Sequence, residues 1–303
     1  MESLRKEAFE KSLNELNIPL ITGDQVTKIQ KVGEGAFGEV FRGKFGEIDV
    51  AIKQIKIDAK MERDTREDVY KTILNEIQVM LLADSTGIPK FFGLWKNDNC
   101  YHLIFEFIFG KSFRNCHQEM DKVSKLRLIH EFLTTLAQFH DKKLIHRDIK
   151  PDNIMVESKT NRPILIDFGV SKIARKTATF TQLQRGTIMY ISPEMYFDED
   201  EDADQDDQDA KPVPVSTYCD IWSVGCMISE IFSGILPWNT ERLTLNQFQI
   251  EGQMVNKKKF PIPQNLDADI KELVESTQHL DYTQRPNARE LQSRIEKILE
   301  NYK

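Results

Sequence analysis

The stretch that decides the interpretation of this 303-residue chain is Leu144-Ile145-His146-Arg147-Asp148-Ile149-Lys150-Pro151-Asp152-Asn153-Ile154-Met155. Apolar, strand-like residues flank a polar loop that concentrates acidic, basic and amide side chains. A second motif follows and reads Ile164-Leu165-Ile166-Asp167-Phe168-Gly169. Asn153 and Asp167 offer two oxygen ligands that can hold Mg²⁺ against the phosphates of a substrate. Asp148 then remains to accept the proton of a substrate hydroxyl.

Upstream of this loop lies a glycine-rich segment, Gly33-Glu34-Gly35-Ala36-Phe37-Gly38-Glu39-Val40. Glycines at this spacing let the backbone approach a phosphate, but a dinucleotide-binding turn has the same spacing. The dinucleotide version must open a helix on which the pyrophosphate rests. Here Val40 to Lys44 continue as a strand, which favours a β-hairpin lid over a nucleotide.

Lys53 lies on the next predicted strand, after Val50-Ala51-Ile52. A single lysine in a strand is more often an edge residue whose charged end reaches solvent. The helix predicted over residues 66–83, however, supplies Glu76 on its core-facing side. This arrangement suits a lysine–glutamate pair that holds phosphate oxygens.

Composition excludes several classes of protein. The net charge is −7 and no stripe of Lys and Arg stands out, which argues against a nucleic-acid partner. No stretch has the roughly 18 apolar residues that a membrane span needs. Four cysteines without CxxC spacing predict reduced thiols and a cytoplasmic or nuclear location.

Strand-like segments precede helical ones along the chain. Strands are predicted at 27–32, 39–44, 49–55, 91–95 and 101–107. Further helices are predicted around 126–137, 221–232, 270–280 and 288–299. A sheet-rich part followed by a helix-rich part is an α+β order with two lobes.

Taken in order, these motifs resemble the eukaryotic protein kinase catalytic domain, over residues 29–303. The matching elements are the glycine loop, Ala51-Ile52-Lys53, Glu76, His146-Arg147-Asp148, Asn153, Asp167-Phe168-Gly169 and Ser192-Pro193-Glu194. The resemblance implies a two-lobed kinase fold, with a small antiparallel β-sheet and helix αC in the N-lobe and a large helical C-lobe. It sets an N-terminal extension at 1–24 before a kinase domain at 25–303. Within that domain it places the N-lobe at 25–106, the hinge at 107–111, the C-lobe at 112–303 and an acidic insert at 198–215.

The resemblance also implies roles for the matching residues, with ATP and Mg²⁺ as cofactors and Mn²⁺ as a substitute for Mg²⁺. The catalytic residues would be Asp148 as the base, Lys150 at the γ-phosphate, Lys53 at the α- and β-phosphates and Glu76 as the partner of Lys53. The residues that bind ATP would be Gly33, Gly35, Gly38, Val40, Ala51, Lys53, Glu106, Ile108, Met155 and Asp167. The metal ligands would be Asn153 and Asp167. Phe105 would narrow the pocket behind the adenine, and Glu194 is expected to pair with Arg285.

The predicted activity is that of a serine/threonine protein kinase acting on protein substrates. Lys150, two residues after Asp148, is typical of Ser/Thr kinases, and so is Gly186-Thr187 before Ser192. The amino-acid sequence of the N-lobe also resembles that of the tyrosine-kinase-like branch of these enzymes. Two alternatives remain, a dual-specificity kinase and a pseudokinase scaffold, but the scaffold would need the loss of a key residue and none is lost.

Regulation and substrate choice are the least constrained predictions. Arg147 precedes the predicted base, and in the family such an arginine often contacts a phosphate on the activation segment. Candidate sites for that phosphate are Thr177, Thr179 and Thr181. The alternative for this segment is an ordinary polar loop.

An acidic block at 198–209 carries nine acids in twelve residues and predicts a disordered surface loop. Without these nine acids the net charge of −7 would become +2, so the block sets the sign of the protein's field. It is either a spacer or a means of attracting basic substrates. Asp152 and Glu230 match family positions that often contact basic residues before the acceptor, and they favour substrates with such residues.

Overall fold

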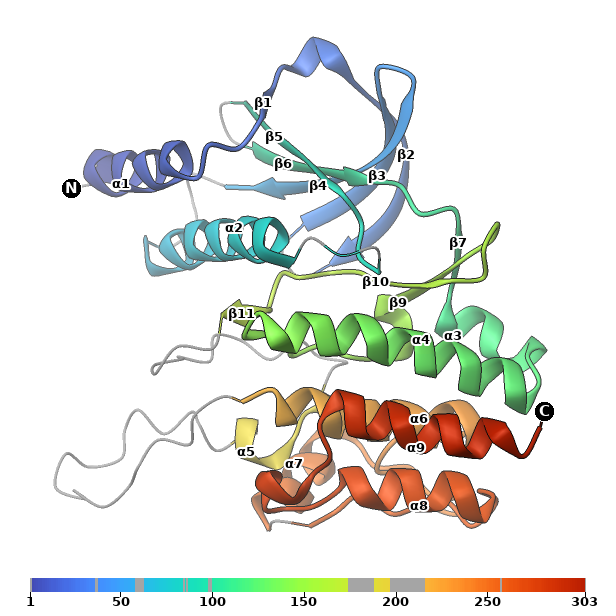
Figure 1. Ribbon diagram of the computed structural model, residues 1–303. Coiled ribbons are helices and arrows are strands. Elements are labelled where there is room, and N and C mark those ends of the chain that lie inside the picture. The colour runs from blue at the N-terminus through green and yellow to red at the C-terminus, as the bar shows by residue number, and fades with distance from the viewer. Residues whose placement is uncertain are drawn as a thin grey trace, which may run out of the picture. The chain divides into compact units, whose positions relative to one another are not determined.

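The computed structural model describes most of the chain and divides it into two compact units (Figure 1). The described residues are 2–35, 38–57, 63–83, 85, 87–97, 100–173, 188–196, 216–256 and 258–302. Unit 1 comprises Met1–Phe109 and Phe168–Ser171, and unit 2 comprises Gly110–Asp167 and Lys172–Lys303. The predicted acidic insert and the three candidate threonines lie outside the described residues.

Unit 1 is built on a six-stranded sheet with the strand order β1-β5-β6-β4-β3-β2. The strands are β1 (Leu20–Ile21), β2 (Val26–Gly35), β3 (Gly38–Phe45), β4 (Ile48–Lys56), β5 (Phe91–Asn97) and β6 (Cys100–Glu106). The five predicted strands are confirmed, and they pair with one another in antiparallel fashion. The sixth, β1, was not predicted and pairs with β5 in parallel. The N-lobe sheet is therefore antiparallel except at one added edge.

Both faces of this sheet bury apolar side chains. Successive side chains of a strand point to opposite faces, so one strand can contribute to both clusters. On one face, Ile55 and Leu103 pack with residues of two helices, α1 (Glu2–Glu15) and α2 (Arg63–Ala83). On the other face, Ile52 and Ile104 form a second cluster with residues of β1 and β2. Helix α2 begins three residues earlier than predicted, and α1 was not predicted at all.

Unit 2 consists mainly of helices around α6, which is buried along most of its length. The helices are α3 (Phe113–Cys116), α4 (Lys122–Asp141), α5 (Pro193–Tyr196), α6 (Tyr218–Ser233), α7 (Gln247–Val255), α8 (Ala268–Thr277) and α9 (Ala288–Glu300). A helix that is apolar all round must be covered on every side, and α6 fits that rule. The four helices predicted for this part are confirmed as α4, α6, α8 and α9.

Short strands hold the polar loops of unit 2. Strand β9 (Ile154–Glu157) pairs with β7 (Gly110–Ser112) and β10 (Pro163–Leu165). Strand β8 (Leu144–Ile145) pairs with β11 (Lys172–Ile173). The loops that carry the sequence motifs begin or end at these strands.

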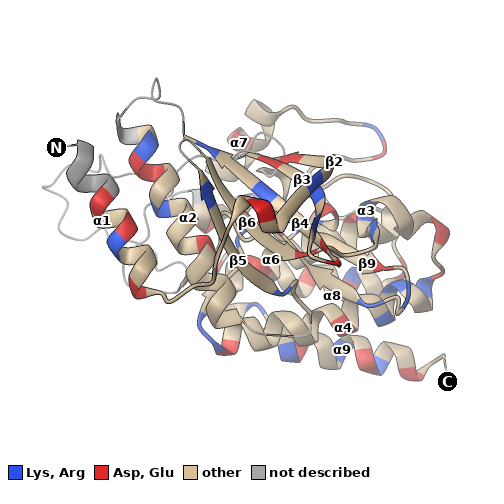
Figure 2. Ribbon diagram, turned by 90° about the horizontal axis from the view of Figure 1, so that it is seen from above, with Lys and Arg blue, Asp and Glu red and all other residues tan. Residues whose placement is uncertain are grey.

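Charge is mixed along the outer helices. Figure 2 shows acidic and basic residues interspersed along α1, α2 and α9. A search of the described residues for a helix both long and apolar enough to cross a membrane finds no candidate.

Candidate active site

The loop after β8 is anchored by Asp220, a fully buried acid near the start of α6. Its carboxylate accepts hydrogen bonds from the backbone N–H groups of His146 (2.9 Å) and Arg147 (2.8 Å), and contacts His140 Nε2 at 2.9 Å. Burial alone would raise the pKa of Asp220, but the hydrogen bond and charge of His140 and the bonds from the loop lower it overall. The sequence analysis missed this residue. An acid at the start of a mostly apolar helix was the signal for it.

Two residues of the loops around the site have left-handed backbone conformations. Arg147 has φ 69° and Asp167 has φ 62°. Such a conformation costs an L-residue other than glycine roughly 1–2 kcal/mol. The bond from the Arg147 backbone to Asp220 helps to hold the strained loop. The strain lies next to Asp148 and at a predicted metal ligand, where it fixes the direction of both side chains.

Asp148 is buried, and its two carboxylate oxygens differ in their surroundings. Oδ2 accepts hydrogen bonds from Lys150 Nζ (2.7 Å) and Asn153 Nδ2 (2.8 Å). Oδ1 has no hydrogen-bond partner among the described residues. A buried carboxylate oxygen without a donor is costly, unless a ligand supplies one. One oxygen is thus held in place, while the other is buried and lacks a donor among the described residues.

Neutral His146 holds the backbone of Asp148. Burial lowers the pKa of this fully enclosed imidazole, which favours its uncharged form. Its Nδ1 accepts the backbone N–H of Asp148 (3.3 Å), and its Nε2 donates to the carbonyl of Ile166 (3.2 Å). Through His146 the loop is tied to the residue before Asp167.

The predicted metal ligands also have a suitable arrangement within unit 2. Asn153 Nδ2 donates to both the carbonyl and the carboxylate of Asp148, at 2.8 Å each. Because the amide is planar, its oxygen is turned away from Asp148. The backbone N–H of Ile166 donates to the Asn153 carbonyl (2.9 Å), which keeps the end of β10 beside Asn153. The donor set, one amide oxygen and one carboxylate, fits Mg²⁺.

Within the described ranges, no group of three or more His, Cys, Asp or Glu side chains could hold a metal ion. An ion bound by Asn153 and Asp167 would complete its coordination with oxygens of a substrate or water, as Mg²⁺ usually does. This is the behaviour expected of Mg²⁺ that arrives with a nucleotide.

In unit 1, the predicted ion pair between Lys53 on β4 and Glu76 on α2 is confirmed. Lys53 Nζ donates to Oε1 at 2.7 Å and to Oε2 at 2.9 Å. The Glu76 side chain is only 2% exposed and that of Lys53 is 12% exposed, so both charges are largely out of water. The pair joins the helix to the sheet.

The predicted hairpin lid is present as β2 and β3, with Gly33 opposite Val40 and Gly35 opposite Gly38. Residues 36–37 at its tip lie outside the described residues. Gly38 has φ 155°, and a Cβ there would lie 1.9 Å from the carbonyl oxygen of Gln54. Only glycine fits at this position of the hairpin.

The residues predicted to contact adenine divide between the units. Val40, Ala51, Glu106 and Ile108 belong to unit 1, and Met155 lies on β9 of unit 2. The Glu106 N–H donates to the carbonyl of Lys90 (2.8 Å), so this N–H is not available to an adenine edge. The adenine contacts of the other residues stay predictions.

A cluster around Arg114 of α3 was not predicted. Arg114 donates to Asp152 Oδ2 from Nε (3.0 Å) and Nη2 (2.8 Å), and to the Tyr190 hydroxyl (2.7 Å). It also contacts Glu230, which accepts from Tyr190 as well. Burial raises the pKa of Tyr190 to about 12. The two acids expected to face a basic substrate therefore already face an arginine of the same chain, and no motif in the sequence marks that arginine.

The second predicted ion pair, Glu194 with Arg285, is also confirmed. Arg285 Nη1 donates to Oε1 at 2.6 Å and Nη2 to Oε2 at 2.8 Å. The same guanidinium donates to the backbone carbonyls of His279 (2.9 Å) and Tyr218 (3.0 Å). This pair fixes α5 to the segment before α9.

The prediction that a phosphate on the activation segment contacts Arg147 is not tested by the described residues. Arg147 has its backbone fixed by Asp220, as described above. Its proposed partners Thr177, Thr179 and Thr181 lie outside the described residues. A phosphate on that segment stays a prediction.

Comparison with known proteins agrees with the geometry. The protein kinase domain matches residues 26–294. Curated relatives include the serine/threonine-protein kinase BCK1/SLK1/SSP31 of Saccharomyces cerevisiae, 26% identical over 88% of this chain and 18% of its own length. The mitogen-activated protein kinase kinase kinase ANP1 of Arabidopsis thaliana is 28% identical over 82% of this chain and 36% of its own length.

A third relative, the mitogen-activated protein kinase kinase kinase mkh1 of Cytospora mali, is 26% identical over 80% of this chain and 13% of its own length. The chain thus spans well under half the length of these relatives. Kinase domains use ATP and a divalent metal ion in general, and Asn153 and Asp167 offer oxygen atoms that suit such an ion. Because the domain match covers nearly all of the sequence, this chain belongs to the protein kinase family.

Proposed function

We propose that this chain is a serine/threonine protein kinase that transfers the γ-phosphoryl group of ATP to hydroxyl groups of protein substrates. The observation that carries the proposal is the asymmetry of Asp148. Lys150 and Asn153 hold Oδ2, whereas Oδ1 has no partner among the described residues. A substrate hydroxyl that donates to Oδ1 would be oriented for attack on phosphorus.

In the proposed reaction the hydroxyl oxygen forms a bond to the γ-phosphorus while the bond from that phosphorus to the β-phosphate oxygen breaks. The hydroxyl proton passes to Asp148 Oδ1, and ADP leaves. Lys150 lies 2.7 Å from Oδ2 and would place a positive charge beside the transferred group. Asn153 and Asp167 would hold Mg²⁺, which when bound neutralises phosphate charge. Lys53, positioned by Glu76, would hold the α- and β-phosphates.

Preference for serine and threonine rests on two kinds of support. Lys150 follows Asp148 at the spacing typical of Ser/Thr kinases and contacts its carboxylate. One relative is named as a serine/threonine-protein kinase and others as mitogen-activated protein kinase kinase kinases. At 26–28% identity these names support the acceptor class.

We also propose that any preference for basic substrates depends on the acidic block at 198–209 and not on Asp152 and Glu230. Arg114 already offsets the charge of those two residues. The nine acids of the block would act through long-range attraction, which weakens beyond a Debye length of about 8 Å at physiological salt.

The test is a transfer assay with the purified chain, radiolabelled ATP, Mg²⁺ or Mn²⁺ and a generic protein substrate, followed by phosphoamino-acid analysis. We expect phosphoserine and phosphothreonine, and a loss of roughly 10²–10⁴ in rate in Asp148→Asn. The matched control is Asp141→Asn, which changes an exposed acid at the end of α4. Phosphotyrosine in addition would indicate dual specificity. ATP binding without transfer would instead identify a pseudokinase and overturn the proposal.

A further inference from the structure

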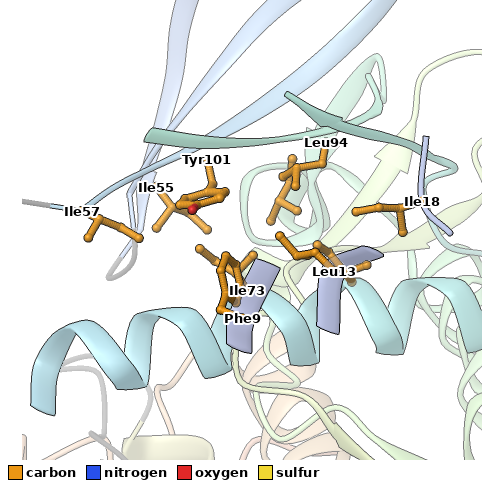
Figure 3. Close-up of a cluster of buried hydrophobic side chains, with 10 residues drawn as sticks. Phe9, Leu13, Ile18, Ile55, Ile57, Ile73, Leu94 and Tyr101 are labelled. Atoms are coloured by element: carbon orange, nitrogen blue, oxygen red, sulfur yellow. The ribbon is translucent and has the colours of Figure 1, made fainter. Parts of the chain in front are cut away.

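The N-terminal helix α1 lies outside the stretch that matches the kinase domain, yet it contributes to the core of unit 1. The match begins at residue 26, whereas Phe9 and Leu13 of α1 and Ile18 after it are 4%, 3% and 8% exposed. Figure 3 shows Phe9 and Leu13 pointing into the space between α2 and the sheet, beside Ile73, Leu94 and Tyr101. This core is therefore shared between the family's domain and a segment added to it.

Phe9 joins α2 to the sheet through aromatic contacts. Its ring lies 4.5 Å from that of Tyr70 on α2 and 5.3 Å, edge to face, from that of Tyr101 on β6. The two tyrosine rings are themselves 6.2 Å apart. Edge-to-face and tilted pairs at such separations each stabilise packing beyond simple burial. The Phe9 ring thus fills the angle where helix and sheet meet.

Polar contacts fix α1 in this position. Glu10 accepts a hydrogen bond from the Tyr101 hydroxyl (3.1 Å) and pairs with Lys96 Nζ (2.6 Å). Both partners come from the β5–β6 hairpin. The helix is therefore oriented on the sheet by one acid and two donors.

The chain that leaves α1 is attached to the same sheet. The N–H of Leu94 donates to the carbonyl of Pro19 (2.9 Å), and β1 continues beside β5. Gly93 makes this approach possible, because its φ is 149° and a Cβ there would lie 2.3 Å from the Pro19 oxygen. Both the helix and its exit are held, so α1 is a fixed support for what packs against it.

What packs against it is the helix that carries Glu76. Tyr70, Ile73 and Ile77 of α2 face this core, at intervals of three and four residues. In the sequence Glu76 lies between Ile73 and Ile77, and its Oε1 lies 2.7 Å from Lys53 Nζ. A rotation or shift of α2 would lengthen that contact. The position of α2 therefore determines whether the ion pair forms.

We propose that Phe9 and Leu13 are positioning residues for the Lys53–Glu76 ion pair, which they hold in register by packing α1 against α2. The inference rests on the proposed function, because it assigns the pair a part in phosphoryl transfer. It predicts that α1 acts on catalysis through Glu76 and not only on stability.

The decisive experiment is a double-mutant cycle on kcat/KM for ATP in the full chain, with Phe9→Ala, Glu76→Gln and the combination. Phe9→Ala alone should lower kcat/KM about 10- to 100-fold, since a displacement of about 1 Å costs that much. In the Glu76→Gln background the same change should have little further effect, because the ion pair is already lost. Phe9→Leu, which keeps an apolar side chain, should restore most of the activity.

The matched control is Leu291→Ala, which truncates a fully buried residue of α9 in unit 2. Its loss of thermal stability should not lower kcat/KM at temperatures where the protein stays folded. Fully additive effects of Phe9→Ala and Glu76→Gln, or unchanged kcat/KM in folded Phe9→Ala, would overturn the proposal.

Hydrogen exchange separates failure of this inference from failure of the proposed function. Phe9→Ala should speed amide exchange in residues 63–83, and Leu291→Ala should not. If the wild-type chain transfers no phosphate, this measurement alone decides. Unchanged exchange in α2 would then refute the positioning role.

Discussion

Two buried ion pairs join distant parts of the chain, one in each unit, and their cations differ. In unit 2, the Arg285 side chain is fully buried and donates to both oxygens of Glu194 and to two backbone carbonyls, with its guanidinium 5.0 Å from the Trp222 ring. In unit 1, Lys53 places one ammonium against both oxygens of Glu76 and stays 12% exposed.

The two cations suit different roles: the Arg285 pair is a rigid structural link, and the Lys53 pair can adapt to a further partner. A planar guanidinium bonded along its edges has a single orientation, and its partners are fixed with it. An ammonium on a flexible four-carbon stem can turn toward another oxygen without loss of its first partner. We therefore expect the arginine pair to govern stability and the lysine pair to govern activity. The predictions below test that division.

The largest effect is expected from Arg285→Ala. Removal of the cation leaves Glu194 and two carbonyls without their donor in a buried site, which should lower the free energy of unfolding by roughly 3–5 kcal/mol. Urea denaturation would measure the loss. Arg289→Ala, which removes an exposed arginine of α9, should change stability by less than about 1 kcal/mol. Equal losses in the two variants would contradict the structural role of Arg285.

Next is Lys53→Met, which should lower the transfer rate by about 10²–10³-fold, as expected for the loss of one fixed charge at developing phosphate charge. Adding Glu76→Gln should recover thermal stability, because no unpaired buried carboxylate remains, but should not recover activity. Lys56→Met, on the same strand but 64% exposed, is the control and should stay active. Recovery of activity in the double variant would refute the division between the two pairs.

In both ion pairs a buried cation faces an acid. The buried His102 instead faces a cation, Lys28. Burial and the nearby Lys28 lower the pKa of His102 to about 4, below its usual 6.5. Between pH 4 and pH 6.5, His102 binds a proton in the unfolded chain but not in the folded one. The free energy of unfolding is therefore highest above pH 6.5 and falls as the pH falls toward 4. We expect a loss of about 2 kcal/mol between pH 7 and 4.5. Denaturation of His102→Gln at both pH values should show a smaller change, and an identical change would refute the assignment.

The smallest effect concerns Arg114, because one of its two acids is largely exposed while the other, Glu230, is buried. Asp152 is 47% exposed, so Arg114→Ala should free its charge toward bound peptides. We expect about a fivefold rise in kcat/KM for peptides with arginine near the acceptor over matched alanine peptides, at low salt. Arg127→Ala, an exposed arginine of α4, should leave the ratio unchanged. An unchanged ratio in Arg114→Ala would refute the proposal that Arg114 offsets the charge of Asp152 and Glu230.

The sequence allowed the prediction of the sites whose residues form continuous motifs. Asp148, Asn153 and Asp167 stand in short polar stretches between apolar strands, and such contrast is visible without a structure. The Lys53–Glu76 pair was predicted from the pattern of strand and helix, and the Glu194–Arg285 pair from the family resemblance. The roles of these residues in binding and transfer stay predictions.

Other features escaped prediction because tertiary contacts create them. Helix α1 has few apolar residues among many charges, so no periodic stripe marks it, and its helical form depends on packing against α2 and the sheet. Strand β1 has only two residues and depends on Gly93 for its close approach. Arg114 is an ordinary arginine until the fold brings Asp152 and Glu230 to it. Information of this kind lies in pairs of distant positions.

The docking of α1 has a consequence for the order in which the chain is synthesised. Glu10 and Tyr101, which bond in the folded protein, are 91 positions apart, so α1 leaves the ribosome well before the hairpin that receives it. A helix of fourteen residues is marginal by itself in water. Phe9 and Leu13 therefore lack part of their partners until β6 emerges, and the core of unit 1 can close only then.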